Sequence, residues 1–495
     1  KRTAVNTMRN CSRQFFIVIG VMQGGRTRMY ELTMSLNPKS KTPLYEQIYE
    51  FIKEEIQNNV IQSGERLPST RALSKHLVVS RSTVELAYEQ LLSEGYVEAI
   101  PCKGYFVAKI EGIYQLQKRP EIKVEPISSG VTEYAYDFTP NGVDLNSFPY
   151  NVWRKLSKEC LIDDKAEMFR LGNPQGEYGL RNVISSYLHQ ARGIHCHPDQ
   201  IIIGAGSDYL LMLLTTVIGN CHKVALENPT YGQAYRLFER LSYKVCTVDM
   251  DQSGMRIDEL EKSGADIAFV MPSHQYPLGC VMPIQRRMEL LKWADGAEGR
   301  YIIEDDYDSE FRYKGKPIPA LQGSDSNGKV IYTGTFSKSL APSIRMSYMV
   351  LPEHILKIYQ EKCRFISSTV SKVDQMILQK FMEEGYYERH LNKTRALYKN
   401  RHDVLISSLR KMKEILEISG ENAGVHLLLH FKTDDSEKDL IEKAAKQGVR
   451  VYGLSEYCVK DNEDSTGKAV ILLGYANMNE ERIRAAVQLL CKAWK

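Results

Sequence analysis

The sequence lacks the cysteine pattern of a disulfide-stapled or zinc-binding protein. Its ten cysteines are scattered along 495 residues, and no two form a CxxC pair, the spacing on which many zinc sites and redox dithiols depend. The HCH triplet at residues 195–197 is too compact to chelate a metal ion by itself. We therefore expect reduced thiols, a cytoplasmic protein and no metal site.

The sequence also lacks a strong net charge and a long hydrophobic run. A formal net charge of +4 gives no bulk electrostatic reason to expect a nucleic-acid or membrane partner. The first 28 residues hold six basic and no acidic residues around the apolar run FFIVIGVM. This superficially matches a secretory signal, but the run is too short to span a bilayer. Nothing later suits export, so we interpret residues 1–28 as non-native or as an upstream extension.

What is present suits a soluble protein with a large core. Hydrophobic residues make up 43% and charged residues 25% of the chain, as in ordinary globular proteins. Residues 29–109 read as three short helices, with apolar positions at helical spacing over 44–56, 69–77 and 84–92. Only a tight connection separates the second helix from the third, which predicts a helix-turn-helix.

The two ends of the third helix carry further signals. Ser82 and Glu85 fit a capping box at its start, and Gly95 fits the residue just past its end. The stretch GYVEAIPCKGYFV then predicts two short strands around a tip at Lys103 and Gly104. Such a hairpin after a helix-turn-helix is a wing.

Charge in this module is concentrated in one place. Residues 29–109 hold nine basic and ten acidic residues, yet the stretch from 66 to 81 has four basic residues and no acid. This cluster flanks the start of the third helix, the end that enters a major groove in such motifs. Lysine and arginine there would neutralise phosphates, and an arginine could read guanine. Patterning alone leaves open a three-helix interaction domain with an incidental basic face.

The stretch GERLPSTRALSKHLVVSRSTVELAYEQLLSEGYVEAIPCKGYFV resembles the winged-helix domain of GntR-family transcription regulators. It keeps that family's order of elements. The resemblance implies binding to double-stranded operator DNA. It assigns the contacts to Arg71, to Arg81 and Thr83 at the recognition helix, and to Lys103 and Gly104 in the wing.

A second, larger domain follows a linker. Residues 110–134 contain prolines and charges without clean periodicity, so we interpret them as the linker. Over residues 135–495, helical stretches alternate with apolar runs: QIIIGAG, HKVALENP, YKVCTVDM, DIAFVMPS, RYIIEDDY and KVIYTGTF. Continuous apolar runs between helices predict an α/β fold with a mostly parallel sheet covered on both faces. Ligands of such sheets collect at the carboxyl ends of the strands.

Polar residues at these strand ends match the needs of pyridoxal 5′-phosphate. This cofactor requires a lysine for its aldehyde, a carboxylate for its ring nitrogen, a phosphate cup and a planar group against its ring. Each residue alone has an ordinary explanation as a strand-end polar group, but together they predict the cofactor. In chain order the candidates are Gly206 and Ser207 in a GAGS turn, Tyr231, Asp305 with Tyr307, and Lys338 in TGTFSKSLAPSIR.

These motifs resemble fold-type I, class I aminotransferases over most of the second domain. The resemblance implies that Lys338 forms the Schiff base and that Asp305 pairs with the pyridine nitrogen. Tyr307 would bond the ring 3-hydroxyl, and Tyr231 would stack on the ring. The implied phosphate cup consists of Gly206, Ser207, Thr335, Ser337 and Arg345.

One loop departs from the aminotransferase pattern. The usual NPTG motif is replaced by HQYPLG, so we expect His274 and Tyr276 to line the cofactor where the family has an asparagine.

A GntR-type winged helix fused to an aminotransferase-like domain is the arrangement of MocR-type regulators. The stretches PSHQYPLGCVMP and RYIIEDDYDSEFRY look especially like the GABA-responsive members. The resemblance implies a cytoplasmic bacterial transcription factor and a head-to-tail homodimer. It also implies an effector with an amino group, which displaces Lys338 by forming an external aldimine.

The effector is predicted not to be GABA. GABA-responsive members hold the effector's carboxylate with two arginines, and the corresponding residues here are Gln233 and Glu456. Losing two cations disfavours an anionic ligand by roughly 1.5–3 kcal/mol per charged hydrogen bond. We expect an effector with a neutral or cationic distal end, or one whose carboxylate is bound elsewhere. The alternative is that Glu456 faces solvent in a mobile loop.

Two other functions stay open on the sequence alone. A working aminotransferase with an accessory N-terminal domain would use the same lysine and cofactor, although ILLGYANM near the C-terminus offers no arginine for a substrate carboxylate. A DNA-binding structural protein with a vestigial cofactor site would keep the motifs without loading the cofactor.

Overall fold

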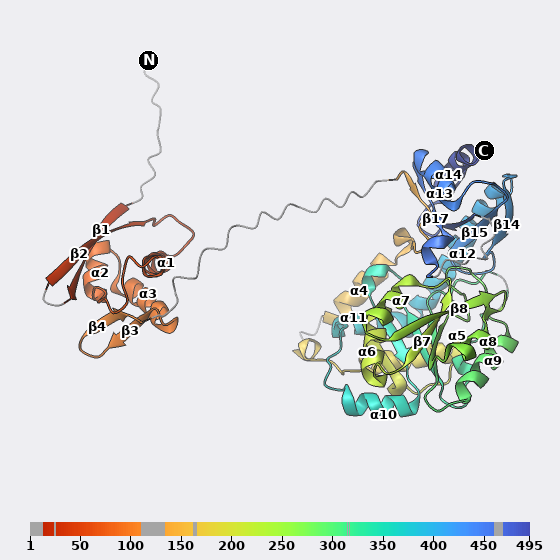
Figure 1. The fold of residues 1–495 in the computed structure, drawn as a ribbon, viewed down its shortest axis with the longest axis horizontal. Helices are drawn as coiled ribbons and strands as arrows, with labels where there is room; N and C mark the ends of the chain where they lie inside the picture. Colours follow the sequence, from red (N-terminus) through yellow and green to blue (C-terminus); the bar gives the residue numbers. More distant parts are fainter. Residues whose placement is uncertain are drawn as a thin grey trace, which may run out of the picture. The chain divides into compact units, whose positions relative to one another are not determined.

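The chain divides into two compact units, residues 1–130 and 131–495 (Figure 1). The computed structural model describes residues 13–23, 26–109, 134–161, 166–313, 315, 317–459 and 469–495. The predicted linker at residues 110–134 lies almost wholly outside the described residues. None of the described helices has both the length and the apolar character that crossing a membrane requires.

The N-terminal unit is a winged helix-turn-helix, as predicted. Helices α1 (Leu44–Gln57) and α2 (Thr70–Leu77) both pack on α3 (Arg81–Ser93). Their apolar stripes bury Ile48, Leu73 and Tyr88 in one core. The wing is the antiparallel pair β3 (Val97–Ile100) and β4 (Gly104–Val107).

A further hairpin precedes these helices. Strands β1 (Arg13–Gln23) and β2 (Arg26–Leu36) pair antiparallel. Met34 and Leu36, at the end of β2, are buried in the core of the winged helix. The domain boundary that we expected before Met29 therefore falls inside β2.

The start of α3 differs from the prediction. The cap is Ser80, whose hydroxyl oxygen accepts a hydrogen bond from the Thr83 backbone N–H at 3.1 Å. The predicted capping box of Ser82 and Glu85 is therefore wrong, because the helix begins at Arg81 and already includes Ser82. Glu85 instead lies one turn after Arg81 and pairs with it at 2.7 Å.

The second unit is built on an eight-stranded sheet in the order β6-β13-β12-β11-β10-β7-β8-β9. All six apolar runs picked out in the sequence are strands of this sheet and run parallel to one another. They are β6 (Ile201–Gly204), β7 (Lys223–Asn228), β8 (Lys244–Asp251), β10 (Ile267–Val270), β11 (Tyr301–Asp306) and β12 (Val330–Thr335).

Two antiparallel strands complete the sheet, β9 (Gly254–Met255) and β13 (Ser347–Val350). The connection from β12 to β13 contains only the short helical turn η6 (Pro342–Ile344). A parallel crossover needs a longer connection, usually a helix, so β13 returns antiparallel. This return places the segment around Lys338 over the carboxyl ends of the strands.

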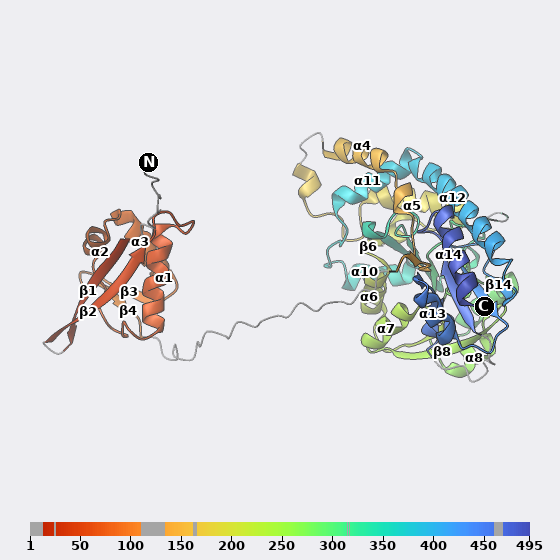
Figure 2. The ribbon, with the colours of Figure 1, turned by 90° about the horizontal axis from the view of Figure 1, so that it is seen from above.

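Helices cover both faces of the sheet, as expected for parallel strands (Figures 1 and 2). Neighbouring residues of one strand enter different cores: Ile303 packs with α6, α7 and α10, whereas Ile302 packs with α8 and α9. The helices are α4 (Tyr150–Leu161), α5 (Tyr178–Arg192), α6 (Ser207–Ile218), α7 (Gly232–Arg240), α8 (Ile257–Ser263), α9 (Ile284–Asp295), α10 (Glu353–Lys362) and α11 (Lys372–Glu383).

A smaller layer follows toward the C-terminus. Its sheet has the order β14 (Ile415–Ser419), β15 (His426–Phe431), β18 (Val470–Gly474) and β17 (Tyr452–Gly453). It packs against α12 (Tyr386–Leu409), α13 (Glu437–Lys446) and α14 (Glu480–Ala493), of which α12 and α14 lie side by side in Figure 2. Strand β5 (Tyr136–Asp137) pairs with β16 (Val449–Arg450) and ties the start of the unit to this layer.

Candidate cofactor site and nucleic-acid interface

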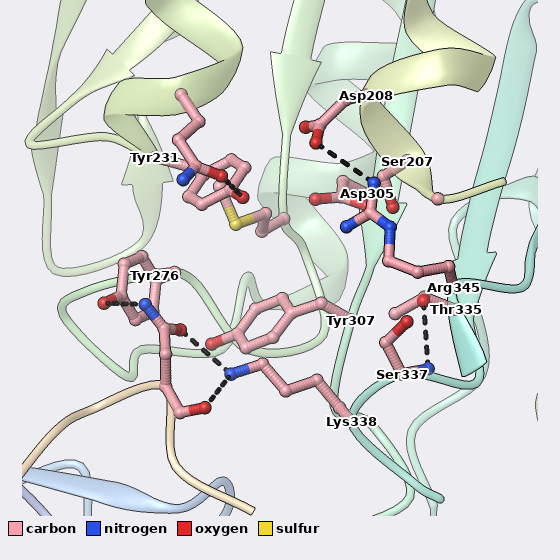
Figure 3. Close-up of a pocket in the computed structure, with 14 residues that line it drawn as sticks. Ser207, Asp208, Tyr231, Tyr276, Asp305, Tyr307, Thr335, Ser337, Lys338 and Arg345 are labelled. Atoms are coloured by element: carbon pink, nitrogen blue, oxygen red, sulfur yellow. Dashed lines mark hydrogen bonds and ion pairs between the residues drawn. The ribbon is translucent and has the colours of Figure 1, made fainter. Parts of the chain in front are cut away.

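One pocket brings together all but two of the residues predicted to bind cofactor or effector (Figure 3). It lies where β11 and β12 end and where α6 and α7 begin. Parallel pairing of β11 with β12 sets Asp305 beside Thr333. The predicted residues that line the pocket are Gly206, Ser207, Tyr231, Gln233, Tyr276, Asp305, Tyr307, Thr335, Ser337, Lys338 and Arg345.

Asp305 is a carboxyl group that lacks a cationic partner in the described structure. It accepts a hydrogen bond from the Thr333 hydroxyl at 3.0 Å. Burial, reinforced by the neighbouring carboxylates of Asp306 and Asp308, raises its pKa to about 7. A protonated pyridine nitrogen would supply the missing cation, so the surroundings of Asp305 suit the ring nitrogen of pyridoxal phosphate, and its role stays a prediction.

Lys338 is an amine prepared for reaction with an aldehyde. Its Nζ donates hydrogen bonds to the backbone oxygen and to Oδ1 of Asn141, at 3.1 and 2.9 Å. Removal from water lowers the pKa of Lys338 to about 8, while the charge of Asp308 acts in the opposite direction. A lowered pKa leaves more of the amine neutral at physiological pH, and the neutral amine is the nucleophile.

The start of α6 is a candidate anion site. Gly206 precedes the helix with φ +98°, and a Cβ atom there would lie 2.5 Å from Arg345 Nη2. The guanidinium of Arg345 donates to the Ala205 carbonyl at 3.2 Å and lies 3.6 Å from the Asp208 carboxylate. Free N–H groups at a helix start beside an arginine suit a phosphate. Thr335 lies beside Arg345 in Figure 3, and its Oγ1 accepts a hydrogen bond from the Ser337 N–H at 3.2 Å.

Three tyrosine rings form the aromatic wall of the pocket. The Tyr276 ring lies edge-on to Tyr231 and Tyr307, with centroids 6.2 and 5.8 Å apart. The Tyr276 hydroxyl donates to the Tyr457 hydroxyl at 3.1 Å. Tyr231 donates its hydroxyl to Gln233 Oε1. These faces provide the planar contacts that a pyridine ring requires.

Asn141 is a pocket residue that the sequence analysis missed. Its two oxygens accept hydrogen bonds from Lys338, and its Nδ2 donates one to the Tyr276 hydroxyl at 3.3 Å. It lies after β5, far from Lys338 in the sequence and outside every strand-end motif, so no local pattern singles it out.

Two predicted residues do not line the pocket. His274 lies behind Tyr307, with Nδ1 3.0 Å from the tyrosine hydroxyl, and is buried. Glu456 is exposed on the turn η7 (Leu454–Tyr457). Its neighbour Tyr457 is the residue of this turn that contacts Tyr276.

The predicted DNA-contacting residues lie at the surface of the N-terminal unit. Arg71, Arg81 and Lys103 are exposed on α2, at the start of α3 and in the wing turn. Thr83 is partly exposed, and its hydroxyl lies 2.6 Å from that of Ser80. Gly104 has φ +107° at the wing.

Each of the two units matches a known protein family. Residues 44–107 match the family "Bacterial regulatory proteins, gntR family", and residues 140–490 match "Aminotransferase class I and II". The solved Pyrococcus horikoshii kynurenine aminotransferase is similar in fold, with a TM-score of 0.65 and 25% identity, over 74% of this chain and 91% of that chain.

Similarity to regulators extends over nearly the whole chain. The HTH-type transcriptional regulator YhdI of Bacillus subtilis (strain 168) is 41% identical over 94% of this chain and 98% of that protein. The probable rhizopine catabolism regulatory protein MocR of Rhizobium meliloti is 30% identical over 93% of this chain and 95% of that protein. The chain therefore belongs to the MocR-type regulators of the GntR family, which join a DNA-binding winged helix to an aminotransferase-like domain with pyridoxal phosphate as its cofactor.

Proposed function

We propose that this protein regulates transcription in the cytoplasm and senses an amino compound at Lys338. The observation that carries the sensing role is the set of groups in one pocket: the Lys338 amine, the Asp305 carboxyl and the anion site at Arg345. When bound, pyridoxal phosphate supplies an aldehyde that condenses with primary amines and a ring that withdraws electrons. Lys338 would hold the cofactor through this aldehyde, and an effector amine would compete with Lys338 for it and so free the lysine.

Asn141 is the acceptor that we propose for the released lysine. Its two oxygens already receive hydrogen bonds from Nζ of Lys338. It follows β5, the first strand after the predicted linker. Occupation of this acceptor therefore biases the segment that leads toward the DNA-binding unit, and such a bias can shift a two-state equilibrium.

The lining of the pocket supports an effector other than GABA. Of the described residues that line it, Lys338 and Arg345 are the cations. We assign the first to the aldehyde and the second to the phosphate, so a distal carboxylate finds no remaining cation. Gln233 offers an amide instead. Glu456 is exposed and outside the lining, so of the two residues that replace the arginines only Gln233 lies in the pocket.

A homodimer, head-to-tail as the resemblance to MocR-type regulators implies, forms part of the proposal. Phe169, Leu171 and Phe365 are 79%, 88% and 82% exposed in the isolated chain. Large apolar side chains exposed to this degree favour burial against another surface. A second copy of the chain is the partner that we propose.

A working aminotransferase is the second candidate. It is favoured by the Asp305 and Lys338 pair, since proton transfer in transamination needs the same groups. The absence of a free cation from the described lining disfavours an amino-acid substrate. Single-turnover transfer of an amino group to a 2-oxo acid, if it were fast, would select this candidate.

The proposed function is tested by titrating the loaded protein with amines. We expect amines with neutral or cationic distal ends to change both the cofactor absorbance and the affinity for operator DNA. GABA at micromolar concentration should change neither. A protein that stays colourless after soaking with pyridoxal phosphate, or one that responds to micromolar GABA, contradicts the proposal.

A further inference from the structure

A buried imidazole–carboxylate pair lies directly behind Tyr307. The side chains of His274 and Asp308 are 2% and 1% exposed, and both Asp308 oxygens lie 3.0 Å from His274 Nδ1. The same nitrogen lies 3.0 Å from the Tyr307 hydroxyl oxygen. Neither His274 nor Asp308 lines the pocket, so the pair reaches it through the tyrosine hydroxyl.

Two glycines form a slot for the imidazole. A Cβ atom on Gly424 would overlap His274 Cε1, and one on Gly279 would lie 3.4 Å from His274 Nε2. The Gly424 carbonyl accepts hydroxyl hydrogen bonds from Tyr313 and Tyr475 at 2.6 and 2.9 Å, which fixes one wall of the slot. The slot therefore holds the ring in one orientation, with its Nδ1 edge toward Asp308 and Tyr307.

The neighbours of Nδ1 determine where the protons lie. A carboxylate only accepts hydrogen bonds, so Nδ1 carries a proton and donates it. The Tyr307 oxygen faces the same N–H and acts there as an acceptor, which leaves the hydroxyl proton free to point elsewhere. Among the described residues, this hydroxyl has no hydrogen-bond partner besides His274. The direction that remains is the pocket.

Other groups around the ring do not disturb this arrangement. The ring of His426 lies 5.5 Å from that of His274, and its Nε2 donates to the Pro277 carbonyl at 2.8 Å. Burial, together with the charge of His274, lowers the pKa of His426 to about 3, so His426 is neutral. Tyr276 packs edge-on against His426 and directs its own hydroxyl to Tyr457.

We propose that His274, held by Asp308, is a positioning residue that aims the Tyr307 hydroxyl proton at the 3-oxygen of the bound cofactor. The inference rests on the cofactor assignment made above. A hydrogen bond donated to that oxygen stabilises its charged form and favours loss of the proton it shares with the nitrogen of Lys338. The pair therefore sets the pH at which the bound cofactor changes protonation state.

The test is a pH titration of the cofactor absorbance of the full-length loaded protein, without effector or DNA. His274→Leu removes the donor and frees the Tyr307 hydroxyl to turn toward Asp308. We expect the midpoint to rise by about one pH unit, a tenfold change in proton affinity. His274→Asn keeps an N–H near the position of Nδ1 and should restore most of the shift.

Further variants show whether the effect passes through Tyr307. Tyr307→Phe should raise the midpoint similarly, and the double variant with His274→Leu should add nothing, because both changes remove one hydrogen bond. His426→Gln, which retains a donor near Pro277, should keep the wild-type midpoint. If His274→Leu does not fold, His274→Phe replaces it: a ring still fills the slot but carries no N–H, so the midpoint should again rise.

The outcomes separate this inference from the proposed function. A wild-type midpoint in the folded, loaded His274→Leu or His274→Phe variant overturns the inference, as do additive shifts in the double variant. The proposed function would survive that result, since amine titrations of the wild-type protein test it independently. Absence of any cofactor absorbance in the wild-type protein overturns both.

Discussion

At the scale of single residues, the pocket holds two ionisable groups whose pKa values shift in opposite directions. Burial raises the pKa of the Asp305 carboxyl to about 7 and lowers that of the Lys338 amine to about 8. Both shifts have the same cause, because a charged side chain is costly away from water and burial therefore favours the neutral form. A cofactor that brings its own pyridinium and aldehyde satisfies both groups at once. The side chains are thus prepared for a ligand rather than for each other.

The raised pKa of Asp305 predicts how the cofactor-free protein depends on pH. Its ordinary pKa is 3.8, so between about pH 4 and 7 the folded state holds a proton that the unfolded state has lost. Stability therefore falls as pH rises through this window. Asp305→Asn removes this pH-dependent loss of stability and should stabilise the cofactor-free chain at pH 8 by on the order of 4 kcal/mol, with little effect at pH 4.

Thermal unfolding of both cofactor-free proteins at the two pH values measures this difference. The same variant should bind pyridoxal phosphate more weakly, because an amide is a poorer partner for a pyridinium. A variant less stable than wild type at pH 8 would show that the carboxylate is paired in solution.

At the scale of elements, the sequence patterns predict the helices and strands better than their ends. The six apolar runs are strands because parallel strands are buried on both faces and so leave continuous apolar stretches. Strand β13 was not picked out, because its sequence SYMV is short and follows a segment rich in small polar residues, with no continuous apolar run. The capping box was misplaced because Ser80 and Ser82 both suit an N-cap and only the backbone distinguishes them.

The residues of the site also divide into those that the sequence predicts and those that it does not. Residues at strand ends, such as Lys338 and Asp305, are predictable because parallel strands end at one edge of the sheet. Asn141 and Asp308 are not, because their roles depend on contacts between segments distant in sequence or on burial. His274 was predicted to line the cofactor but lies behind Tyr307, since the two glycine walls that hold it, Gly279 and Gly424, come from separate loops.

The cap at the start of α3 gives a prediction at this scale. Ser80→Ala removes the acceptor for the Thr83 N–H and should destabilise the winged helix by about 1 kcal/mol. Ser82→Ala is the matched control and should cost less, since Ser82 lies within the first turn of α3. Urea unfolding of the full chain, followed by hydrogen exchange of the first turn of α3, measures both. Equal losses in the two variants would contradict the assigned cap.

At the scale of the whole molecule, the DNA-binding unit and the pocket lie in different compact units of one chain. Any regulation by an amine is therefore a coupling free energy between two sites. Such coupling is reciprocal: if the amine changes operator affinity by some factor, operator DNA changes amine affinity by the same factor. A factor of 5–150 is typical of allosteric proteins.

Substitution of Lys338 tests whether amine binding and operator binding are coupled through this pocket. Lys338→Ala removes the amine that the cofactor and effector exchange, so operator affinity should stay near the wild-type value and lose its dependence on the amine. In the wild-type protein, amine titrations followed by cofactor absorbance, with and without operator DNA, should give the factor found from DNA binding with and without amine. An amine that alters absorbance but leaves operator affinity unchanged would indicate a pocket uncoupled from DNA. Operator binding that still responds to the amine in Lys338→Ala would place the sensor outside this pocket.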